Sequence, residues 1–329
     1  MKVTVLGDGG WGTTLSILLT KKGYNVSLWG VFPEYLEILK TKRENPKFLP
    51  GVRISKSIYI SSDLREITKD AELLILAIPS LFMRRVLKRL KDSSFKNRII
   101  LSVTKGVESN TLMRMSEIIS EVLGNVNLAV LSGPTIAHEV ARGIPTTCVI
   151  ASKDEELSNR LQEIFMTERF RVYTNSDLVG VELGGALKNI IAIACGISDG
   201  LGYGANTKAA LLARGLAEIS RLGVAMGARR ETFWGISGLG DLVTTCISPH
   251  SRNRAVGERI GRGGKLKDIL SSMEMVAEGI YTAKSAYRLS LKYNVELPIT
   301  KEVYLVLYRN KKPLDAVNDL MKRERKKEF

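Results

Sequence analysis

Short apolar runs rich in β-branched residues recur through the first half of the chain, and helical hydrophobic patterns separate several of them. Such runs are typical of strands, and their alternation with helical segments is typical of a mainly parallel sheet covered on both faces. The sequence therefore predicts an α/β fold with a doubly wound sheet. The predicted strands are Lys2–Gly7, Asn25–Trp29, Ser57–Ile60, Leu73–Ile78, Arg98–Val103, Leu128–Leu131, Thr147–Ala151 and Phe170–Thr174.

The pattern changes near Asp177, and from there helical periodicity continues through the rest of the chain. We expect two domains, a sheet domain over residues 1–178 and an all-helical domain over residues 179–329. Glycine clusters and prolines are the expected helix stops in the second domain. They lie at Gly196–Gly204, Gly235–Gly240, Gly261–Gly264, Pro298 and Pro313.

The first strand runs into a glycine-rich turn, GDGGWG, that starts at Gly7 and is followed by a helical pattern over Thr13–Lys21. Gly7 permits a tight turn, Gly9 lets the backbone approach a pyrophosphate, and Gly12 permits close packing of helix on strand. The start of the helix supplies free N–H groups for phosphate. Strand, turn, helix and strand in this order predict a Rossmann-type dinucleotide-binding domain.

The end of the second strand leaves the type of dinucleotide open. An acidic residue there would hold a ribose 2′-hydroxyl, and an arginine would suit a 2′-phosphate. The chain has Gly30, Val31 and Phe32 at this place, with Glu34 a little beyond. NAD and NADP therefore both remain possible cofactors.

Lys188 lies within a long apolar helical run, Val179–Ala194, where an ammonium group is costly to bury. Helical side chains lean toward the preceding turn, where Gly184 and Gly185 leave space beside the amine. A desolvated lysine suits proton transfer. The alternative is a lysine on a half-exposed helix, with the glycines serving helix–helix contact.

Two further candidates follow predicted strands, at the edge where such sheets bind ligands. Lys105 comes after the strand Arg98–Val103, and the turn Ser132–Thr135 comes after Leu128–Leu131. The simpler alternatives are a surface lysine and an ordinary helix entry.

The helical domain adds a possible phosphate cradle. Ser251 is a suitable helix N-cap, so the free N–H groups of that turn and the Arg252 guanidinium together suit phosphate. Asp241 could orient Lys188 or accept a hydrogen bond from a substrate hydroxyl. The alternatives are a helix-capping aspartate and an arginine on a solvated helix face.

The formal net charge is +15, and such a field attracts small anions. A nucleic-acid partner is not expected, because basic residues are neither interleaved with aromatics nor set in a recognition motif. Cys148, Cys195 and Cys246 are widely spaced and odd in number, which favours reduced thiols. With only His138 and His250 available, a histidine-based zinc site is not expected, and no metal is assigned.

We expect no membrane-spanning helix, because no apolar run in the sequence reaches the roughly 18 residues that span a bilayer. The chain enters a strand at once, so no signal peptide is expected. These features predict a cytoplasmic enzyme.

Taken together, the motifs resemble bacterial NAD(P)-dependent glycerol-3-phosphate dehydrogenase. The runs are SGPT at Ser132, VELGGALKN at Val181, GLGD at Gly238 and SRNR at Ser251, and with GDGGWG and VAEG at Val276 they cover essentially the whole chain. The family interconverts sn-glycerol 3-phosphate and dihydroxyacetone phosphate and supplies glycerophospholipid synthesis. It pairs a Rossmann-type domain with a helical substrate domain, and the resemblance suggests a homodimer.

The resemblance also implies residue roles. Lys188 would exchange the proton of the C2 hydroxyl, with Asp241 beside it, and Lys105 would touch both cofactor and substrate. The implied cofactor contacts, beyond Gly7, Gly9, Gly12 and Lys105, are Gly10, Trp11, Ala137, Arg252, Val276 and Glu278. The implied substrate contacts are Lys105, Gly133, Thr135, Lys188, Asn189, Asp241, Thr245, Ser251, Arg252 and Asn253.

The chain departs from the family pattern at two positions. Gly10 stands where a serine is common, and Val31 stands where a basic residue is common. The second departure counts against a strong NADPH preference. Two other functions stay open: a dehydrogenase of phosphate-free 3-hydroxy acids, and a non-enzymatic cofactor-binding regulator.

Overall fold

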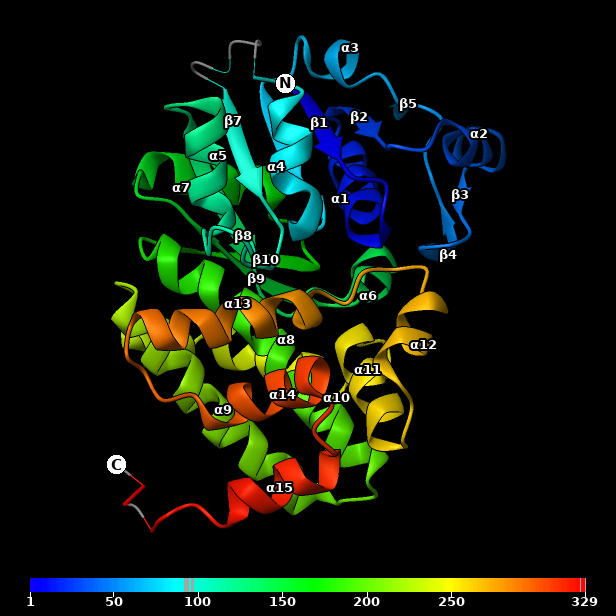
Figure 1. Ribbon diagram of the computed structural model, residues 1–329. Coiled ribbons are helices and arrows are strands. Elements are labelled where there is room, and N and C mark those ends of the chain that lie inside the picture. The colour runs from blue at the N-terminus through cyan, green and yellow to red at the C-terminus, as the bar shows by residue number, and fades with distance from the viewer. Residues whose placement is uncertain (92–94, 96–97, 326, 329) are drawn as a thin grey trace. The chain divides into compact units, whose positions relative to one another are not determined.

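The computed structural model describes residues 1–91, 95, 98–325 and 327–328. The chain divides into two compact units (Figure 1). Unit 1 comprises Met1–Lys105 and Met113–Glu182, and unit 2 comprises Gly106–Leu112 and Leu183–Phe329. The division falls close to the expected one at residue 178. The sequence did not predict that the short segment Gly106–Leu112 belongs with the helical unit.

In the described part of unit 1, eight strands form one sheet in the order β10-β9-β8-β7-β6-β1-β2-β5. Neighbouring strands are parallel except for the antiparallel pair β8 and β9. This confirms the predicted Rossmann-type, mainly parallel sheet. The strands are β1 Lys2–Leu6, β2 Asn25–Trp29, β5 Tyr59–Ser61, β6 Leu73–Leu76, β7 Ile99–Ser102, β8 Asn127–Ser132, β9 Thr146–Ala151 and β10 Phe170–Asn175.

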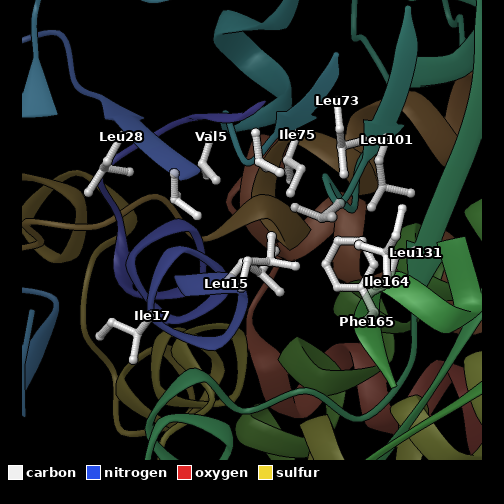
Figure 2. Packing of buried hydrophobic residues seen from close by; sticks show 14 of the residues in the cluster. Val5, Leu15, Ile17, Leu28, Leu73, Ile75, Leu101, Leu131, Ile164 and Phe165 are labelled. Carbon is white, nitrogen blue, oxygen red and sulfur yellow. The ribbon is translucent and has the colours of Figure 1, made fainter. Parts of the chain in front are cut away.

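Both faces of this sheet are buried, which explains why its strands are continuous apolar runs. Because successive side chains point to opposite faces, Val3 and Val5 of β1 join one core cluster while Leu6 joins the other. Figure 2 shows the first cluster, in which Val5 of the sheet gathers with Leu15 of α1 and Phe165 of α7. The helices of unit 1 are α1 Gly10–Lys21, α2 Pro33–Lys42, α3 Leu64–Thr68, α4 Ser80–Lys88, α5 Met115–Leu123, α6 Ala137–Ala141 and α7 Glu155–Phe165.

A small antiparallel ladder in unit 1 was not predicted from the sequence. It pairs β3, Glu44–Asn45, with β4, Leu49–Arg53. The two strands are short, and β4 contains a proline and a glycine, so no alternating pattern marks them. Asn45 of this ladder is fully buried. Its side chain contacts the glycine-rich turn, as described below.

Unit 2 is helical, as the periodicity predicts. Its long helix α8, Leu178–Gly200, begins in unit 1 and continues in unit 2. The remaining helices are α9 Ala205–Ala225, η1 Arg230–Trp234, η2 Ile236–Gly240, α10 Asp241–Ile247, α11 Arg252–Gly261, α12 Leu266–Ser271, α13 Glu278–Lys292, α14 Pro298–Arg309 and α15 Pro313–Met321.

The predicted helix stop over Gly196–Gly204 is confirmed, because α8 ends at Gly200 and α9 begins at Ala205. Two other expectations about these helices need correction. Pro298 and Pro313 do not end helices but begin α14 and α15 at the first turn, where the absent N–H costs nothing.

Helix α8 is also long and apolar enough to pass a simple test for a membrane span, contrary to the expectation that no run reaches that length. However, 94% of its apolar window is buried inside the protein, as in a core helix. The test therefore gives only weak evidence for a span.

Candidate active site

The glycine-rich turn after β1 has the geometry that the motif predicts. Gly7 adopts φ +122°, and a Cβ there would lie 2.4 Å from the carbonyl oxygen of Ala77. A Cβ at Gly12 would lie 1.9 Å from the Gly7 oxygen, so helix α1 can approach β1 only because residue 12 is glycine. Gly9, by contrast, has no atom within 4 Å of where its Cβ would be. This open space beside the first turn of α1 fits the pyrophosphate of a dinucleotide.

The structure gives a reason for the glycine at position 10. A Cβ there would lie 2.5 Å from the Phe48 carbonyl oxygen, next to the β3–β4 ladder, and 3.6 Å from the Cβ of Ala137. A side chain at position 10 would therefore require the backbone at Phe48 to shift. The neighbouring Trp11 has its indole Nε1 buried without a hydrogen-bond partner among the described residues.

Asn45 of β3 contacts this turn, and the sequence did not reveal that contact. Its Nδ2 donates to the Asp8 carbonyl oxygen at 2.8 Å and to the Thr13 hydroxyl at 2.8 Å. Its Oδ1 accepts from the Phe48 backbone N–H at 3.1 Å. A buried amide thus ties the glycine-rich turn to the β3–β4 ladder. No local pattern could have shown this, because the contact joins residues far apart in sequence.

Three of the predicted residues in unit 1 lie together at the carboxyl ends of neighbouring strands β7 and β8. The Lys105 ammonium donates to the Gly133 carbonyl oxygen at 2.8 Å and lies 3.5 Å from the Thr135 hydroxyl. Gly133 has φ +136°, a conformation that favours glycine. The parallel sheet therefore gathers a cation, a carbonyl and a hydroxyl at the edge where such folds bind ligands.

In unit 2 the Lys188 side chain is 6% exposed and forms an ion pair with Asp241, whose side chain is 2% exposed. The ammonium also donates to the Thr245 hydroxyl, and that hydroxyl donates to the Asp241 carbonyl oxygen at 2.7 Å. Asp241 is the first residue of α10 and not its N-cap, which is Gly240. Two helices thus supply a buried cation with its charge partner and a neighbouring hydroxyl.

The sequence suggested that Gly184 leaves space beside the amine of Lys188. The structure shows instead that Gly184 contacts η2. A Cβ at Gly184 would lie 2.8 Å from the Ser237 carbonyl oxygen and 3.4 Å from Gly238. That position permits α8 to pack against η2, directly before Asp241. Of the two explanations given for this glycine, the structure supports helix contact.

Asn189, the residue after Lys188, belongs to a contact that joins three helices of unit 2. Asn253 of α11 donates to the Asn189 side-chain oxygen at 2.9 Å and accepts from the Gly279 backbone N–H of α13 at 2.9 Å. Both polar ends of the Asn253 amide therefore have protein partners. The Asn253 amide thus links α8, α11 and α13.

The helix start that the sequence singled out lies at Ser251 and Arg252, where α11 begins. The Ser251 hydroxyl caps the helix by accepting from the Arg254 N–H at 3.2 Å, as expected. The exposed Arg252 donates to the Val276 carbonyl oxygen at 3.0 Å, two residues before α13 begins at Glu278. Arg252, Val276 and Glu278 thus lie around one helix entry.

Four glycines allow the backbones of α11 and α8 to pack closely. A Cβ at Gly196 would lie 2.0 Å from the Arg254 oxygen, and one at Gly200 would lie 2.3 Å from the Glu258 oxygen. From the other helix, Gly257 and Gly261 would place Cβ atoms 2.1 Å and 2.4 Å from backbone oxygens of α8. This glycine contact, Gly196, Gly200, Gly257 and Gly261, fixes the cradle relative to Lys188.

Further features of the structure are a cavity in unit 2 and three thiols. A cavity of about 660 Å³ is lined mainly by α8, α9, α14, α15 and the C-terminal residues, and by none of the predicted site residues. The three cysteines are free and buried. Among the described residues, no three histidine, cysteine or acidic side chains gather as a metal-ligand group.

Comparison with known proteins agrees with this arrangement. Residues 2–158 match the model of the N-terminal part of NAD-dependent glycerol-3-phosphate dehydrogenase, and residues 177–318 match its C-terminal part.

Two relatives named glycerol-3-phosphate dehydrogenase [NAD(P)+] align over the full chain. The Fusobacterium nucleatum protein is 50% identical, covering 100% of this chain and 99% of the relative. The Syntrophotalea carbinolica protein is 51% identical, covering 100% of both. The crystal structure of glycerol-3-phosphate dehydrogenase from Coxiella burnetii superposes with a TM-score of 0.95 at 36% identity, covering 98% of this chain and 99% of that one. This chain belongs to the NAD-dependent glycerol-3-phosphate dehydrogenase family.

Proposed function

We propose that this chain interconverts sn-glycerol 3-phosphate and dihydroxyacetone phosphate with NAD or NADP, and that Lys188 exchanges the proton of the C2 oxygen. The observation that carries this proposal is the buried Lys188, paired with Asp241 and bonded to Thr245. Similarity to the two full-length relatives supports the reaction.

The nicotinamide of the bound dinucleotide supplies or accepts the hydride. Lys188 manages the proton that accompanies it. Its ammonium donates a proton to the C2 oxygen during reduction, and the amine takes a proton from the C2 hydroxyl during oxidation. Asp241 holds the ammonium in place and balances its charge. The Thr245 hydroxyl accepts a second hydrogen bond from the ammonium, which limits rotation of that group.

The substrate's phosphate lies away from the reacting carbon, so its binding energy can serve positioning. We assign this role to the capped start of α11, where Ser251 orients the helix and Arg252 supplies a guanidinium. Asn189 and Asn253 hold the two helices in register. Lys105, Gly133 and Thr135 form the polar group of unit 1 that we assign to cofactor and substrate.

The open space at Gly9 and the start of α1 are the proposed dinucleotide phosphate site. Gly7, Gly10 and Gly12 shape that turn, and Trp11 and Ala137 border it. Arg252, Val276 and Glu278 are the proposed dinucleotide contacts in unit 2.

The decisive experiment is reduction of dihydroxyacetone phosphate, followed by loss of absorbance of NADH and, in parallel, of NADPH. Oxidation of at least one of them, dependent on this substrate, is the expected result. Unphosphorylated dihydroxyacetone is the matched control and should react far more slowly. Equal rates with and without the phosphate would contradict the proposed substrate and favour a dehydrogenase of phosphate-free hydroxy acids.

We further propose that the enzyme acts in the cytoplasm as a homodimer and supplies glycerophospholipid synthesis. Free, buried cysteines suit a reducing compartment. Unit 2 exposes large apolar side chains, among them Trp234 at 60% and Ile247 at 56%, which a second subunit could cover. Sedimentation equilibrium should give twice the 36.3 kDa of one chain, and a monomer mass at micromolar concentration would contradict the dimer.

A further inference from the structure

Asp8, the second residue of the glycine-rich turn, has a buried carboxylate oxygen without an assigned role. Its Oδ2 has no hydrogen-bond partner among the described residues. Burial raises the pKa of Asp8 above its ordinary value. A buried acceptor left unsatisfied destabilises the fold, so such an atom calls for an explanation.

The carboxyl group lies against the end of β2. A Cβ at Gly30, the first residue after that strand, would lie 2.6 Å from both Cγ and Oδ2 of Asp8. Any larger residue at position 30 would therefore collide with this carboxylate. In dinucleotide-binding folds the end of the second strand normally carries the acidic residue that reads the adenosine ribose. Here Gly30 has no side chain, and Asp8 brings a carboxylate to the same place from the turn.

The backbone at Asp8 is held firmly, so the position of this carboxylate is determined by the fold. The Asp8 carbonyl oxygen accepts from Asn45 Nδ2 at 2.8 Å and from the Thr13 hydroxyl at 3.3 Å. After Gly30, the exposed residues Val31 and Phe32 add no charge at the end of β2.

We propose that Asp8 is the residue that selects the cofactor, favouring a dinucleotide with a free ribose 2′-hydroxyl over one with a 2′-phosphate. The inference rests on the proposed dinucleotide-dependent function. A 2′-hydroxyl donates a hydrogen bond and satisfies the unpartnered oxygen. A 2′-phosphate offers no such donor and brings a second negative charge toward a poorly solvated carboxylate, which is repulsive. The chain is therefore an NAD enzyme by preference.

Direct binding tests this without relying on turnover. NADH and NADPH are titrated into the wild type, Asp8→Asn and Asp8→Ala, with nicotinamide fluorescence as the signal. ADP-ribose and its 2′-phosphate are compared in the same proteins by calorimetry, which isolates the adenosine half. We expect the wild type to bind the 2′-hydroxyl ligands about tenfold or more tightly than the 2′-phosphates. Asp8→Asn should reduce that ratio severalfold, mainly by tightening the 2′-phosphate ligands.

Asp70→Asn is the control, because it removes the same charge from an exposed site of unit 1 and should leave the ratio unchanged. A wild type that prefers the 2′-phosphate ligands would overturn the assignment, whatever the variants do. A ratio unchanged in folded Asp8→Asn would overturn it too. Failure of the wild type to bind either dinucleotide would instead refute the proposed function, and the role of Asp8 with it.

Discussion

Lys188 illustrates how much a single residue depends on its partners. Burying an ammonium costs several kcal/mol unless a charge and hydrogen bonds compensate for the lost water. Asp241 and Thr245 supply that compensation from α10, more than 50 positions further along the chain. The helical pattern around Lys188 could show only that the lysine lay in an apolar run. The buried ion pair with Asp241 distinguishes Lys188 from a lysine on a half-exposed helix surface.

At this scale, Lys188→Met should lower kcat/KM for dihydroxyacetone phosphate by about 10²–10⁴-fold, because the proton of the C2 oxygen loses its exchange partner. Affinity for the dinucleotide, measured by fluorescence titration, should stay close to wild type. Lys208→Met is the matched control, since that lysine pairs with Asp199 and has no assigned role in the reaction.

The lysine variant leaves Asp241 buried without its partner, which costs about 3–5 kcal/mol and could prevent folding. The double variant Lys188→Met with Asp241→Asn removes that charge and should fold while remaining inactive. Near-wild-type turnover in either folded protein would contradict the role of Lys188.

Among the elements, helices α8 and α11 show why the glycines matter. Gly196, Gly200, Gly257 and Gly261 bring the two backbones together with no side chain between them. The sequence predicted a helix stop over Gly196–Gly204, and α8 ends within that range at Gly200. It did not reveal that Gly196 and Gly200 also contact α11, because that contact joins residues far apart in the chain.

Gly196→Ala should destabilise the protein by about 1–3 kcal/mol, because the added methyl meets the Arg254 carbonyl oxygen and α11 must move. KM for dihydroxyacetone phosphate should rise as well, since Ser251 and Arg252 move with α11. Urea unfolding and steady-state kinetics give the two quantities. Gly204→Ala is the control, because no atom lies within 4 Å of the added Cβ. If both variants behave alike, the glycine contact does not position the cradle.

A second element contact predicts a dependence of stability on pH. Glu218 of α9 accepts from the backbone N–H groups of Ile299 and Thr300 at the start of α14, and burial raises its pKa from 4.5 to about 7. Between these values the folded state holds a proton that the unfolded state releases. Its contribution to stability therefore falls as the pH rises from about 4.5 to 7, by about 3 kcal/mol in all.

Glu218→Gln removes this titration. The free energy of unfolding of both proteins is measured by urea titration at about pH 5, 6, 7 and 8. As the pH rises, the wild type should lose stability relative to the variant. A difference that stays constant over this range would show that the carboxyl group titrates near its ordinary pKa in the folded protein.

For the whole molecule, the net charge of +15 is the property that no single element carries. A positive field raises the rate of encounter with anions and weakens as salt screens it. Both the substrate and the dinucleotide of the proposed reaction are anionic. The charge thus acts on association, whereas the buried ion pair acts on the chemical step.

Raising the NaCl concentration from about 0.02 to 0.2 M should therefore lower kcat/KM for dihydroxyacetone phosphate severalfold, while kcat changes little. Steady-state kinetics at each concentration give both values. A chloride salt and a sulfate salt at equal ionic strength separate screening from competition by a phosphate-like anion. A flat response of kcat/KM would mean that the charge does not assist encounter.

The sequence by itself determined what depends on neighbouring residues. Apolar runs alternating with helical segments predicted a mainly parallel sheet, and the glycine spacing predicted a turn in which Gly7 has a positive φ, Gly12 a close backbone contact and Gly9 open space. The resemblance to a family then assigned roles to Lys188 and the start of α11.

The tertiary structure decided what depends on distant residues meeting. Asn45 binds the glycine-rich turn from a ladder too short to leave a pattern, and Gly184 serves η2 where space beside the amine was expected. Asp8 and Gly30 show the difference most clearly. The strand end read alone lacked an acidic residue, yet the fold places one there from the turn. Local sequence fixes backbone conformation and the face that each side chain takes, whereas a site's charge and shape arise from non-local packing.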